Sequence, residues 1–440
     1  MSYYHPNFDV RKKFCECFLP EPREEVYAVV ENMHNLVDEV IMPLRRDLDG
    51  GWTHDQAVAD VAIATAMQAI YDSGWPRAIL PEEKGGLGGV MKSMVTYAML
   101  IEELGRADCG IALDVSLLYW FYSPMLYAGR TDLIDIFGPP LLDGKHHRAC
   151  TSLTEPAGGT NIDDTTQHGR TLRTIARREG DEWVINGAKI WPSGASVADI
   201  GYMTLTTTDP NLGDDGIKLI YVPADAKGLS FGKPIPTMGM CCTDTNTEVF
   251  YDDVRVPVEY AATWGTDMKD VDLFKELAVE DKLTTPAYVN GACQTVLEIL
   301  LDFSKDRIVA GKPMREHSVF VHTIGGLIHM WDYSRASYMQ GCYMADHPEK
   351  YGPLWGKFMY SRAASVDQAC LMAARRIIET AMDLMGSYGT AHEYHLEKYY
   401  RDVKQAELWL GGRYRTQMDV VLDYYDYEWA GPKWEPTPSR

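Results

Sequence analysis

Apolar residues recur every three or four positions through the first third of the chain. Residues 26–41 form one such series, and a second periodic run covers 54–73. This spacing places the apolar side chains on one face of a helix. Together with helices predicted over 91–105 and 113–129, it indicates an all-α N-terminal domain over residues 1–149.

The period changes from near four to two after residue 149. Residues 182–185 lead into Asn186-Gly187, which favours a hairpin turn because both central positions of the preferred turn need a positive φ. Strands are also predicted over 202–208, 217–222 and 248–256. We therefore expect a middle β domain over residues 150–262.

Helical periodicity returns from about residue 267, and the apolar positions of 283–304 again trace one face. Further helices are predicted over 318–345, 357–385 and 399–423. A C-terminal helical bundle is thus expected over 263–425, and the Trp/Pro-rich residues 426–440 are expected to form a tail on a neighbouring surface. The whole pattern predicts an α+β protein with a helical domain on either side of a β domain.

Composition narrows the classes of function. A chain of 440 residues is too long for one small core, and its 46% hydrophobic and 24% charged residues are typical of a globular protein. Its formal net charge of −21 would repel nucleic acid and anionic membranes. Neither a membrane span nor a secretion signal is evident, so we expect a cytoplasmic protein without a nucleic-acid partner.

The nine cysteines are scattered along the chain. The nearest approach to a metal-binding pattern is the adjacent pair Cys241 and Cys242, which has no CxxC partner elsewhere. The expectation is reduced, mostly buried thiols and no metal site.

Four segments carry a family resemblance. They are LTEPAGGTN (153–161), GDEWVINGAKIWPSGASVAD (180–199), DRIVAGKPMREHSVF (306–320) and MGSYGTAHEYHLEKYYRD (385–402). With the domain order, they resemble the acyl-CoA dehydrogenase family over nearly the whole chain. The resemblance implies FAD between the β domain and the C-terminal helices, an acyl-CoA substrate and electron-transfer flavoprotein as acceptor. It also implies a homotetramer or dimer of dimers.

The same resemblance assigns flavin and substrate contacts within the β domain. Leu153 and Thr154 match positions at the flavin, where the Thr154 hydroxyl can donate to the pyrimidine edge of the ring. Trp191 and Ser193 match positions that cover the ring and hydrogen-bond near its reactive end. Thr160 is expected to contact the substrate.

Two further cofactor contacts are expected from the C-terminal domain. Arg307 matches an arginine that reaches the FAD pyrophosphate of a neighbouring subunit, where a guanidinium suits two phosphate oxygens. Gly386 belongs to a glycine-rich turn that receives FAD across the dimer.

The implied reaction removes a proton from the α carbon of an acyl thioester and a hydride from the β carbon, which passes to flavin N5. The usual catalytic Glu falls at Leu410, which cannot accept a proton, although its N–H could polarise the thioester carbonyl; Gly411 is retained at the substrate. Asp281 lies where other branches of the family place the base, and its structural alternative is a helix-start carboxylate. A second candidate is Asp114, whose charge is unusual among its apolar neighbours.

The sequence does not decide whether the acyl group of the substrate is branched, cyclic or dicarboxylic. Arg413 and Arg415 could bind a substrate carboxylate or pair with Glu407. Two alternatives to a dehydrogenase are a flavin-dependent monooxygenase of the same fold and a non-catalytic FAD-binding subunit. A nitroalkane oxidase of this fold keeps a carboxylate at the position of Leu410, which argues against that function.

Overall fold

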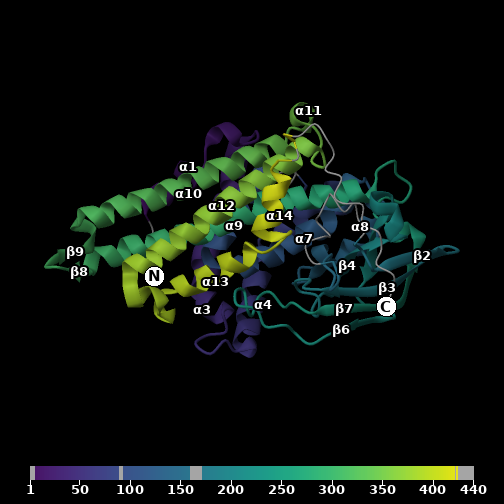
Figure 1. Ribbon diagram of the computed structural model, residues 1–440, viewed down its shortest axis with the longest axis horizontal. Helices are drawn as coiled ribbons and strands as arrows, with labels where there is room; N and C mark the ends of the chain where they lie inside the picture. Colours follow the sequence, from purple (N-terminus) through teal and green to yellow (C-terminus); the bar gives the residue numbers. More distant parts are fainter. Residues whose placement is uncertain (1–4, 89–92, 159–170, 422, 425–440) are drawn as a thin grey trace.

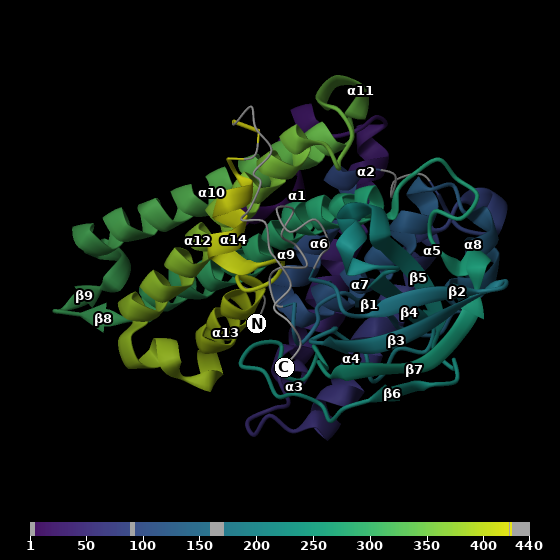
Figure 2. The ribbon, with the colours of Figure 1, turned by 45° about the vertical axis from the view of Figure 1, so that its right-hand side comes forward.

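The computed structural model describes residues 5–88, 93–158, 171–421 and 423–424. Two helical regions and a twisted sheet build an elongated molecule, with the small β8–β9 ribbon at one end and the sheet at the other (Figure 1). Turning the molecule shows the sheet packed beside the N-terminal helices, with α10 and α12 on the far side of α9 (Figure 2). The predicted α+β class and order of helical, β and helical regions are confirmed.

The N-terminal region is helical, as predicted. The predicted series 26–41 spans one α-helix and a π-helical segment, η3, that continues into the next helix. The elements are α1 (Val10–Lys13), α2 (Arg23–Leu36), η3 (Val37–Ile41), α3 (Met42–Leu48), α4 (Gln56–Asp72), α5 (Trp75–Ile79), α6 (Met94–Ala107), α7 (Cys109–Tyr127) and α8 (Thr131–Phe137).

Among the described residues, α7 is the one helix long and apolar enough to suit a membrane span, but 94% of its apolar 18-residue stretch is buried inside the protein. It is apolar all round because it lies in the core. Asp108 caps the N-terminus of the helix by accepting hydrogen bonds from the backbone N–H groups of Gly110 and Ile111.

Seven strands form the sheet of the middle region, in the order β1-β4-β2-β3-β7-β6, with β5 paired to β4. Alternate residues of these strands form a separate core that includes Trp183, Ile185 and Tyr251. The strands are β1 (Ala149–Ser152), β2 (Ile175–Glu179), β3 (Glu182–Ile190), β4 (Gly201–Thr207), β5 (Ile217–Pro223), β6 (Leu229–Phe231) and β7 (Glu248–Pro257).

The predicted hairpin turn at Asn186-Gly187 is wrong. β3 runs through both residues, and the turn that joins β2 to β3 lies at Gly180 and Asp181 instead. Asn186 exchanges hydrogen bonds of 2.9 and 3.0 Å with Asp253 at a bulge in the β3–β7 ladder. The Asn-Gly pair therefore lies in a β-bulge, which, like a tight turn, is a backbone irregularity that accommodates this dipeptide.

The C-terminal region is a bundle of long helices. α10 and α12 have the bounds predicted for them, whereas the predicted continuous helix over 399–423 is wrong, because a turn at residues 407–411 divides it. The elements are α9 (Asp270–Asp306), β8 (Ile308–Val309), β9 (Lys312–Pro313), α10 (Ser318–Ala345), α11 (Pro348–Tyr351), α12 (Lys357–Met385), α13 (Leu396–Ala406) and α14 (Gly412–Asp419).

The two helical regions share one core, because α6 and α9 cross at very close range. A Cβ atom at Gly105 would lie 2.0 Å from the Tyr288 carbonyl oxygen, and one at Gly291 would lie 2.0 Å from that of Glu102. Only glycine allows this contact between backbones. The crossing fixes α9 against the N-terminal helices, and α9 in turn forms one wall of the cavity described below.

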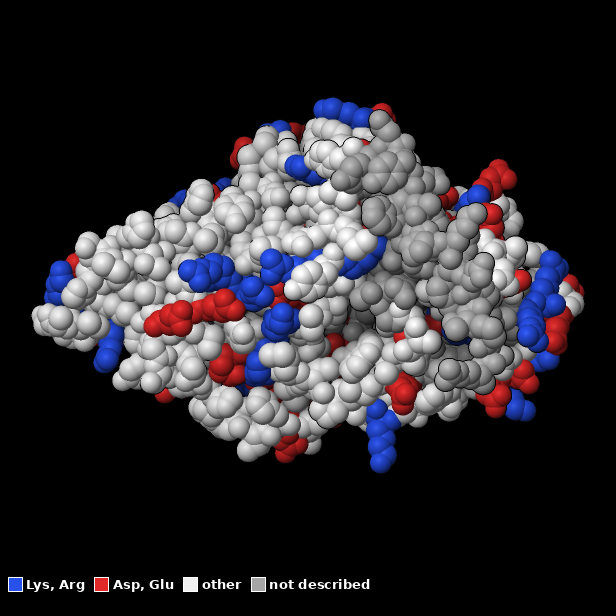
Figure 3. Space-filling model, in the orientation of Figure 1, with Lys and Arg blue, Asp and Glu red and all other residues white. Residues whose placement is uncertain are grey.

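Charged side chains of both signs are interspersed over the face seen in Figure 3, particularly across the helical end. The net negative charge of the chain is therefore not gathered into one acidic patch on this face.

Candidate active site

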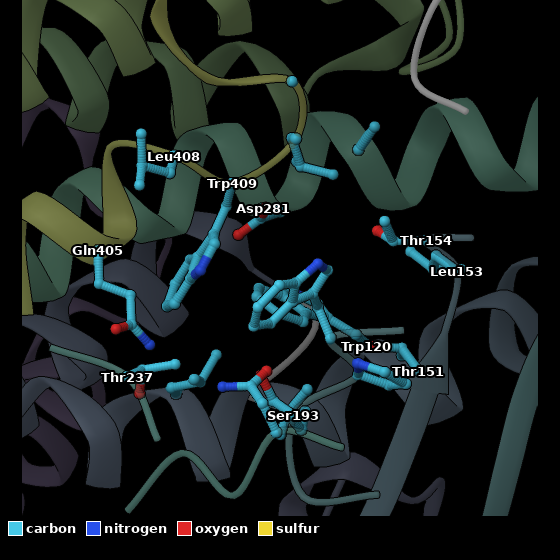
Figure 4. Close-up of a pocket in the computed structure, with 18 of the residues that line it drawn as sticks. Trp120, Thr151, Leu153, Thr154, Ser193, Thr237, Asp281, Gln405, Leu408 and Trp409 are labelled. Carbon is cyan, nitrogen blue, oxygen red and sulfur yellow. The ribbon is translucent and has the colours of Figure 1, made fainter. Parts of the chain in front are cut away.

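A cavity of about 550 Å³ lies where α7, α9, the turn after α13 and the β region meet. This volume is typical of a small-molecule site. Figure 4 shows Asp281, Thr154, Ser193 and Trp409 extending towards the same space from different elements. The lining residues are Leu113, Leu117, Trp120, Thr151, Leu153, Thr154, Trp191, Pro192, Ser193, Pro236, Thr237, Met238, Asn246, Phe274, Leu277, Ala278, Asp281, Gln405, Leu408, Trp409, Leu410 and Gly411.

The two halves of the β-region motif are joined by a buried ion pair. Lys189 Nζ lies 2.8 Å from Glu155 Oε1 and donates at 2.8 Å to the Leu153 carbonyl oxygen. The Thr154 carbonyl oxygen accepts from the Ile190 N–H at 2.9 Å. Although burial acts to raise the pKa of Glu155, the Lys189 charge holds it below its usual value. These contacts place Leu153 and Thr154 beside the end of β3.

Trp191 and Ser193 follow β3 directly, and both line the cavity. Trp191 has a φ of 71°, uncommon for a residue other than glycine, and its side chain is half exposed. The turn therefore carries the indole to the cavity opening rather than into the sheet core. The resemblance predicted this pair beside Leu153 and Thr154, and the structure brings all four to one cavity.

Asp281 reaches the cavity from α9. Phe274, Leu277, Ala278 and Asp281 occupy one face of that helix, at spacings of three and four. The Thr285 hydroxyl donates to Asp281 Oδ1 at 2.6 Å, and the Tyr288 hydroxyl lies 3.2 Å from Thr285 Oγ1. This short chain of hydroxyls orients the carboxylate at the cavity wall.

Leu410 and Gly411 form the opposite wall in the turn between α13 and α14. Their φ angles are 44° and 91°, and a Cβ at Gly411 would lie 2.4 Å from Arg415 Cγ. Lys282, next to Asp281, donates from Nζ to the Leu410 carbonyl oxygen at 3.3 Å and so connects the turn to α9. Within the described residues, the N–H groups of Leu410 and Gly411 have no hydrogen-bond acceptor, which leaves two donors at the cavity.

Asp114 is not among the described cavity-lining residues. Its Oδ2 lies 2.5 Å from Arg148 Nη2, and the pair joins α7 to the start of the β region. Glu280, the neighbour of Asp281, also turns away from the cavity and accepts hydrogen bonds from Tyr119 at 3.2 Å and Ser123 at 2.8 Å; burial raises its pKa to about 7. The structure thus separates Asp281 from the two acidic residues that could compete with it as a base.

Arg307 and Gly386 lie away from the cavity, at the β8–β9 end of the molecule (Figure 1). They are near one another, because Arg307 Cζ lies 5.3 Å from the ring of Tyr388 in the turn that Gly386 begins. Both residues are exposed. Their contact with the FAD of another subunit stays a prediction.

The structure gives a different result for each of the three residues predicted to contact the substrate. Gly411 lines the cavity, Arg413 does not, and Thr160 lies outside the described residues. The suggested pairing of the two arginines with Glu407 is not found in the described part of the chain: Arg415 lies 2.7 Å from Asp419, and Glu407 pairs with Arg375 and Lys404 instead.

One polar edge of the cavity has no counterpart in the sequence prediction. Thr237, Asn246 and Gln405 line it, and Gln405 Nε2 donates at 2.9 Å to the buried carboxylate of Asp244 behind it. Burial raises the pKa of Asp244 to about 6, against the opposing effect of hydrogen bonds from neighbours that include Ser193. No motif marks this edge, because its residues come from two segments that meet only in the fold.

The lining suits a planar, partly polar ring system such as that of FAD. Trp120, Trp191 and Trp409 offer flat apolar surfaces, while Thr154 and Ser193 offer hydroxyl groups. The buried Trp120 Nε1–H has no partner among the described residues, so a ligand acceptor could satisfy it.

Comparison with known proteins identifies the class. Models of the acyl-CoA dehydrogenase N-terminal, middle and C-terminal domains match residues 23–145, 150–254 and 278–422, respectively. The chain therefore belongs to the acyl-CoA dehydrogenase family, whose members bind FAD and oxidise CH–CH bonds.

Individual relatives have low sequence identity to this chain, but the matches cover most of both chains. Cyclohexane-1-carbonyl-CoA dehydrogenase of Syntrophus aciditrophicus is 24% identical over 410 residues, covering 92% of this chain and 97% of the relative. Cyclohex-1-ene-1-carbonyl-CoA dehydrogenase of Geobacter metallireducens is 26% identical over 332 residues, covering 75% and 82%. The solved butyryl-CoA dehydrogenase of Megasphaera elsdenii has a TM-score of 0.76 at 21% identity, covering 91% of this chain and 97% of that one.

Proposed function

We propose that this chain is an FAD-dependent dehydrogenase of cyclic or branched acyl-CoA thioesters in which Asp281 removes the α proton. The observation that carries the proposal is that Asp281 lines the same cavity as Thr154, Trp191 and Ser193. A general base must reach the proton that it removes, and within this cavity Asp281 is the described carboxylate that can do so. Relatives named for cyclohexane- and cyclohexene-carbonyl-CoA support the cyclic acyl group.

The apolar wall of the cavity favours a bulky hydrocarbon over a second carboxylate. Leu113, Leu117, Phe274 and Leu277 supply apolar surface from two helices, and the described lining contains neither Lys nor Arg. A buried carboxylate without a cationic partner would be strongly disfavoured. The dicarboxylic acyl group therefore ranks below the cyclic and branched ones.

Different residues of the cavity would have different roles in the reaction. Asp281, oriented by Thr285, accepts the α proton, and the N–H groups of Leu410 and Gly411 are available to polarise the thioester carbonyl and so acidify that proton. Bound FAD would supply the hydride acceptor. The apolar walls exclude water, which strengthens the hydrogen bonds made within the cavity.

The assembly and partners follow from the same proposal. FAD contacts from Arg307 and Gly386 of another subunit need at least a dimer, which the proposed homotetramer, a dimer of dimers, would contain; both residues are exposed. Electron-transfer flavoprotein is the proposed electron acceptor. The proposed location is the cytoplasm.

An anaerobic panel of thioesters tests the function. Purified FAD-loaded protein is mixed with cyclohexanecarbonyl-CoA, isobutyryl-CoA, butyryl-CoA or glutaryl-CoA, and bleaching of the flavin absorbance is followed. We expect cyclic or branched substrates to bleach it at least about tenfold faster than glutaryl-CoA, an effect of about 1.4 kcal/mol on the barrier. Bound flavin that no thioester bleaches would instead indicate a non-catalytic subunit, and a need for a separate flavin reductase would indicate a monooxygenase.

A further inference from the structure

A cluster of potential metal ligands lies outside the cavity, where the α3–α4 loop meets the segment 236–246. Asp49 and His54 come from the loop, and Cys241 comes from the segment. We propose that these three side chains form a binding site for a divalent cation of the zinc class. The inference is independent of the substrate proposed above.

The three donor atoms are spaced like neighbouring ligands of one tetrahedral ion. Cys241 Sγ lies 3.3 Å from Asp49 Oδ1 and 3.7 Å from His54 Nδ1, and His54 Nδ1 lies 3.6 Å from Asp49 Oδ2. Zinc bonds of about 2.0–2.3 Å at tetrahedral angles separate ligand atoms by roughly 3.3–3.8 Å. The donors are thus already spaced for one ion, and the carboxylate needs only to direct one oxygen towards it.

A tight loop brings His54 back to Asp49. The Asp55 N–H donates to the Gly50 carbonyl oxygen at 2.8 Å, and Gly50 has a φ of 78°. A Cβ at Gly50 would lie 2.5 Å from the Asp55 nitrogen, so glycine is required. The loop places an imidazole and a carboxylate side by side before the cysteine segment packs against them.

The charges balance when the ion is bound. Arg401 binds Asp49 through Nη1 at 3.2 Å and Nη2 at 2.6 Å, and Nη1 lies 4.0 Å from Cys241 Sγ. The Cys241 thiolate and the Asp49 carboxylate carry two negative charges, which equal the two positive charges of the ion, and Arg401 is also paired with Glu397 at 2.8 Å. Binding forms one metal–sulfur bond and releases one proton from the thiol.

The imidazole can supply the third bond from the protein. His54 Nδ1 lies 3.0 Å from the Asp49 carbonyl oxygen, to which it donates when it carries the ring proton. A bound ion takes the Nδ1 lone pair, so the ring proton then resides on Nε2. The His54 side chain is 41% exposed, which gives the ion a route from solvent.

The site would connect the N-terminal helices to the cavity wall. Thr237, Met238 and Asn246 of segment 236–246 line the cavity, and Arg401 Nη1 also donates to the Met238 carbonyl oxygen at 3.0 Å. Three protein ligands leave the fourth position to a water molecule, and because they come from both the loop and the segment, the ion would have a structural role. It would clamp this wall of the cavity to the α3–α4 loop.

Cobalt(II) tests the site in the reduced, FAD-loaded, full-length protein after removal of bound metals with a chelator. Tetrahedral thiolate-bound cobalt absorbs at longer wavelengths than flavin, so the two signals separate. We expect one equivalent to bind with these bands and zinc to displace it. Cys241→Ser and His54→Gln should each weaken cobalt binding at least about 100-fold, beyond the effect typical of an outer-shell change.

A pair of thiols elsewhere in the chain provides the matched control. Cys15 and Cys17 are exposed, with their Sγ atoms 3.0 Å apart, and replacing both by Ser should leave the cobalt bands unchanged. Flavin content and melting temperature show whether each variant is folded. The proposal is overturned if the wild-type protein gives no tetrahedral cobalt bands, if they persist in both Cys241→Ser and His54→Gln, or if they vanish with Cys15 and Cys17.

Discussion

Asp114 on α7 and Asp281 on α9 are both buried, and they differ in whether they line the cavity. Asp114 on α7 is closed off by Arg148, which neutralises it and joins two regions of the chain. Asp281 on α9 faces the cavity and is held by the Thr285 hydroxyl. A carboxylate held outside the cavity by a guanidinium stabilises the fold, whereas one that lines the cavity is placed to accept a proton from a ligand bound there.

The largest expected effect is that of Asp281→Asn. The amide keeps the shape of the side chain but cannot act as a base, so the rate of flavin reduction by a good thioester substrate should fall about 10³-fold. Stopped-flow measurement of flavin bleaching gives this rate. FAD content should remain as in the wild type, and a loss below about tenfold with full FAD would contradict the assignment.

A third buried aspartate, Asp244, accepts a hydrogen bond from the Gln405 amide and has no cation among its hydrogen-bond partners in the described residues. Its pKa is raised from 3.8 to about 6 in the folded protein, so the folded state binds its proton more tightly than the unfolded state does. The stability that this bound proton gives to the folded state is therefore lost as the pH rises from about 4 to 6. Over this window the free energy of unfolding of Asp244→Asn should rise by about 3 kcal/mol relative to that of the wild type.

Thermal melts of both proteins between pH 4 and pH 8 measure this difference. The melting temperature of Asp244→Asn minus that of wild type should increase up to about pH 6 and then level off. A difference that stays constant across the range would show that Asp244 is not held in a protonated state by burial.

Asp114→Asn should affect stability rather than chemistry. Removing one charge of the pair leaves the Arg148 guanidinium partly buried without its partner, at a cost of about 2 kcal/mol after allowance for its partial exposure. Denaturant titration measures the loss, and stopped-flow bleaching should change by less than about threefold. A rate loss comparable to that of Asp281→Asn would reverse the roles assigned to the two helices.

The smallest expected effect is a partial recovery of flavin reduction in the Asp281→Asn protein. Leu410 lines the cavity opposite α9, and Leu410→Glu in the Asp281→Asn protein would supply a carboxylate from the other wall. We expect bleaching about tenfold faster than in Asp281→Asn alone. Leu410→Gln in the same background is the matched control, and equal rates in both double variants would show that the turn cannot deliver a base.

Sequence periodicity located the long helices well because each buries one continuous apolar stripe; α10 and α12 have the bounds that their patterns predict. The break at Leu410 was not predictable in the same way. Leu410 is an apolar residue with a positive φ, so the helical pattern appears to continue through a turn. At Asn186-Gly187 the error is of the opposite kind, since residues that favour a turn form a bulge within a strand.

The candidate site shows the same limit. The sequence alone predicts a shared site for the residues that belong to compact motifs, namely Leu153, Thr154, Trp191 and Ser193. Gln405 and Asn246 share a cavity edge although they lie more than a hundred residues apart, and no local pattern records such a contact. The sequence favours Asp281 as the base and keeps Asp114 as a second candidate, and only the fold shows that Asp281 lines the cavity whereas Asp114 is not among its described lining residues.

Exchange of the substrate α hydrogen with solvent deuterium tests the central claim most directly, because it reports proton removal without requiring hydride transfer. FAD-loaded wild type, Asp281→Asn and Asp114→Asn are incubated anaerobically in D₂O with the thioester that bleaches the wild-type flavin, and deuterium at the α carbon is followed by mass spectrometry. We predict exchange in wild type and Asp114→Asn and none in Asp281→Asn. Exchange that continues in Asp281→Asn, or that disappears only in Asp114→Asn, would contradict Asp281 as the base.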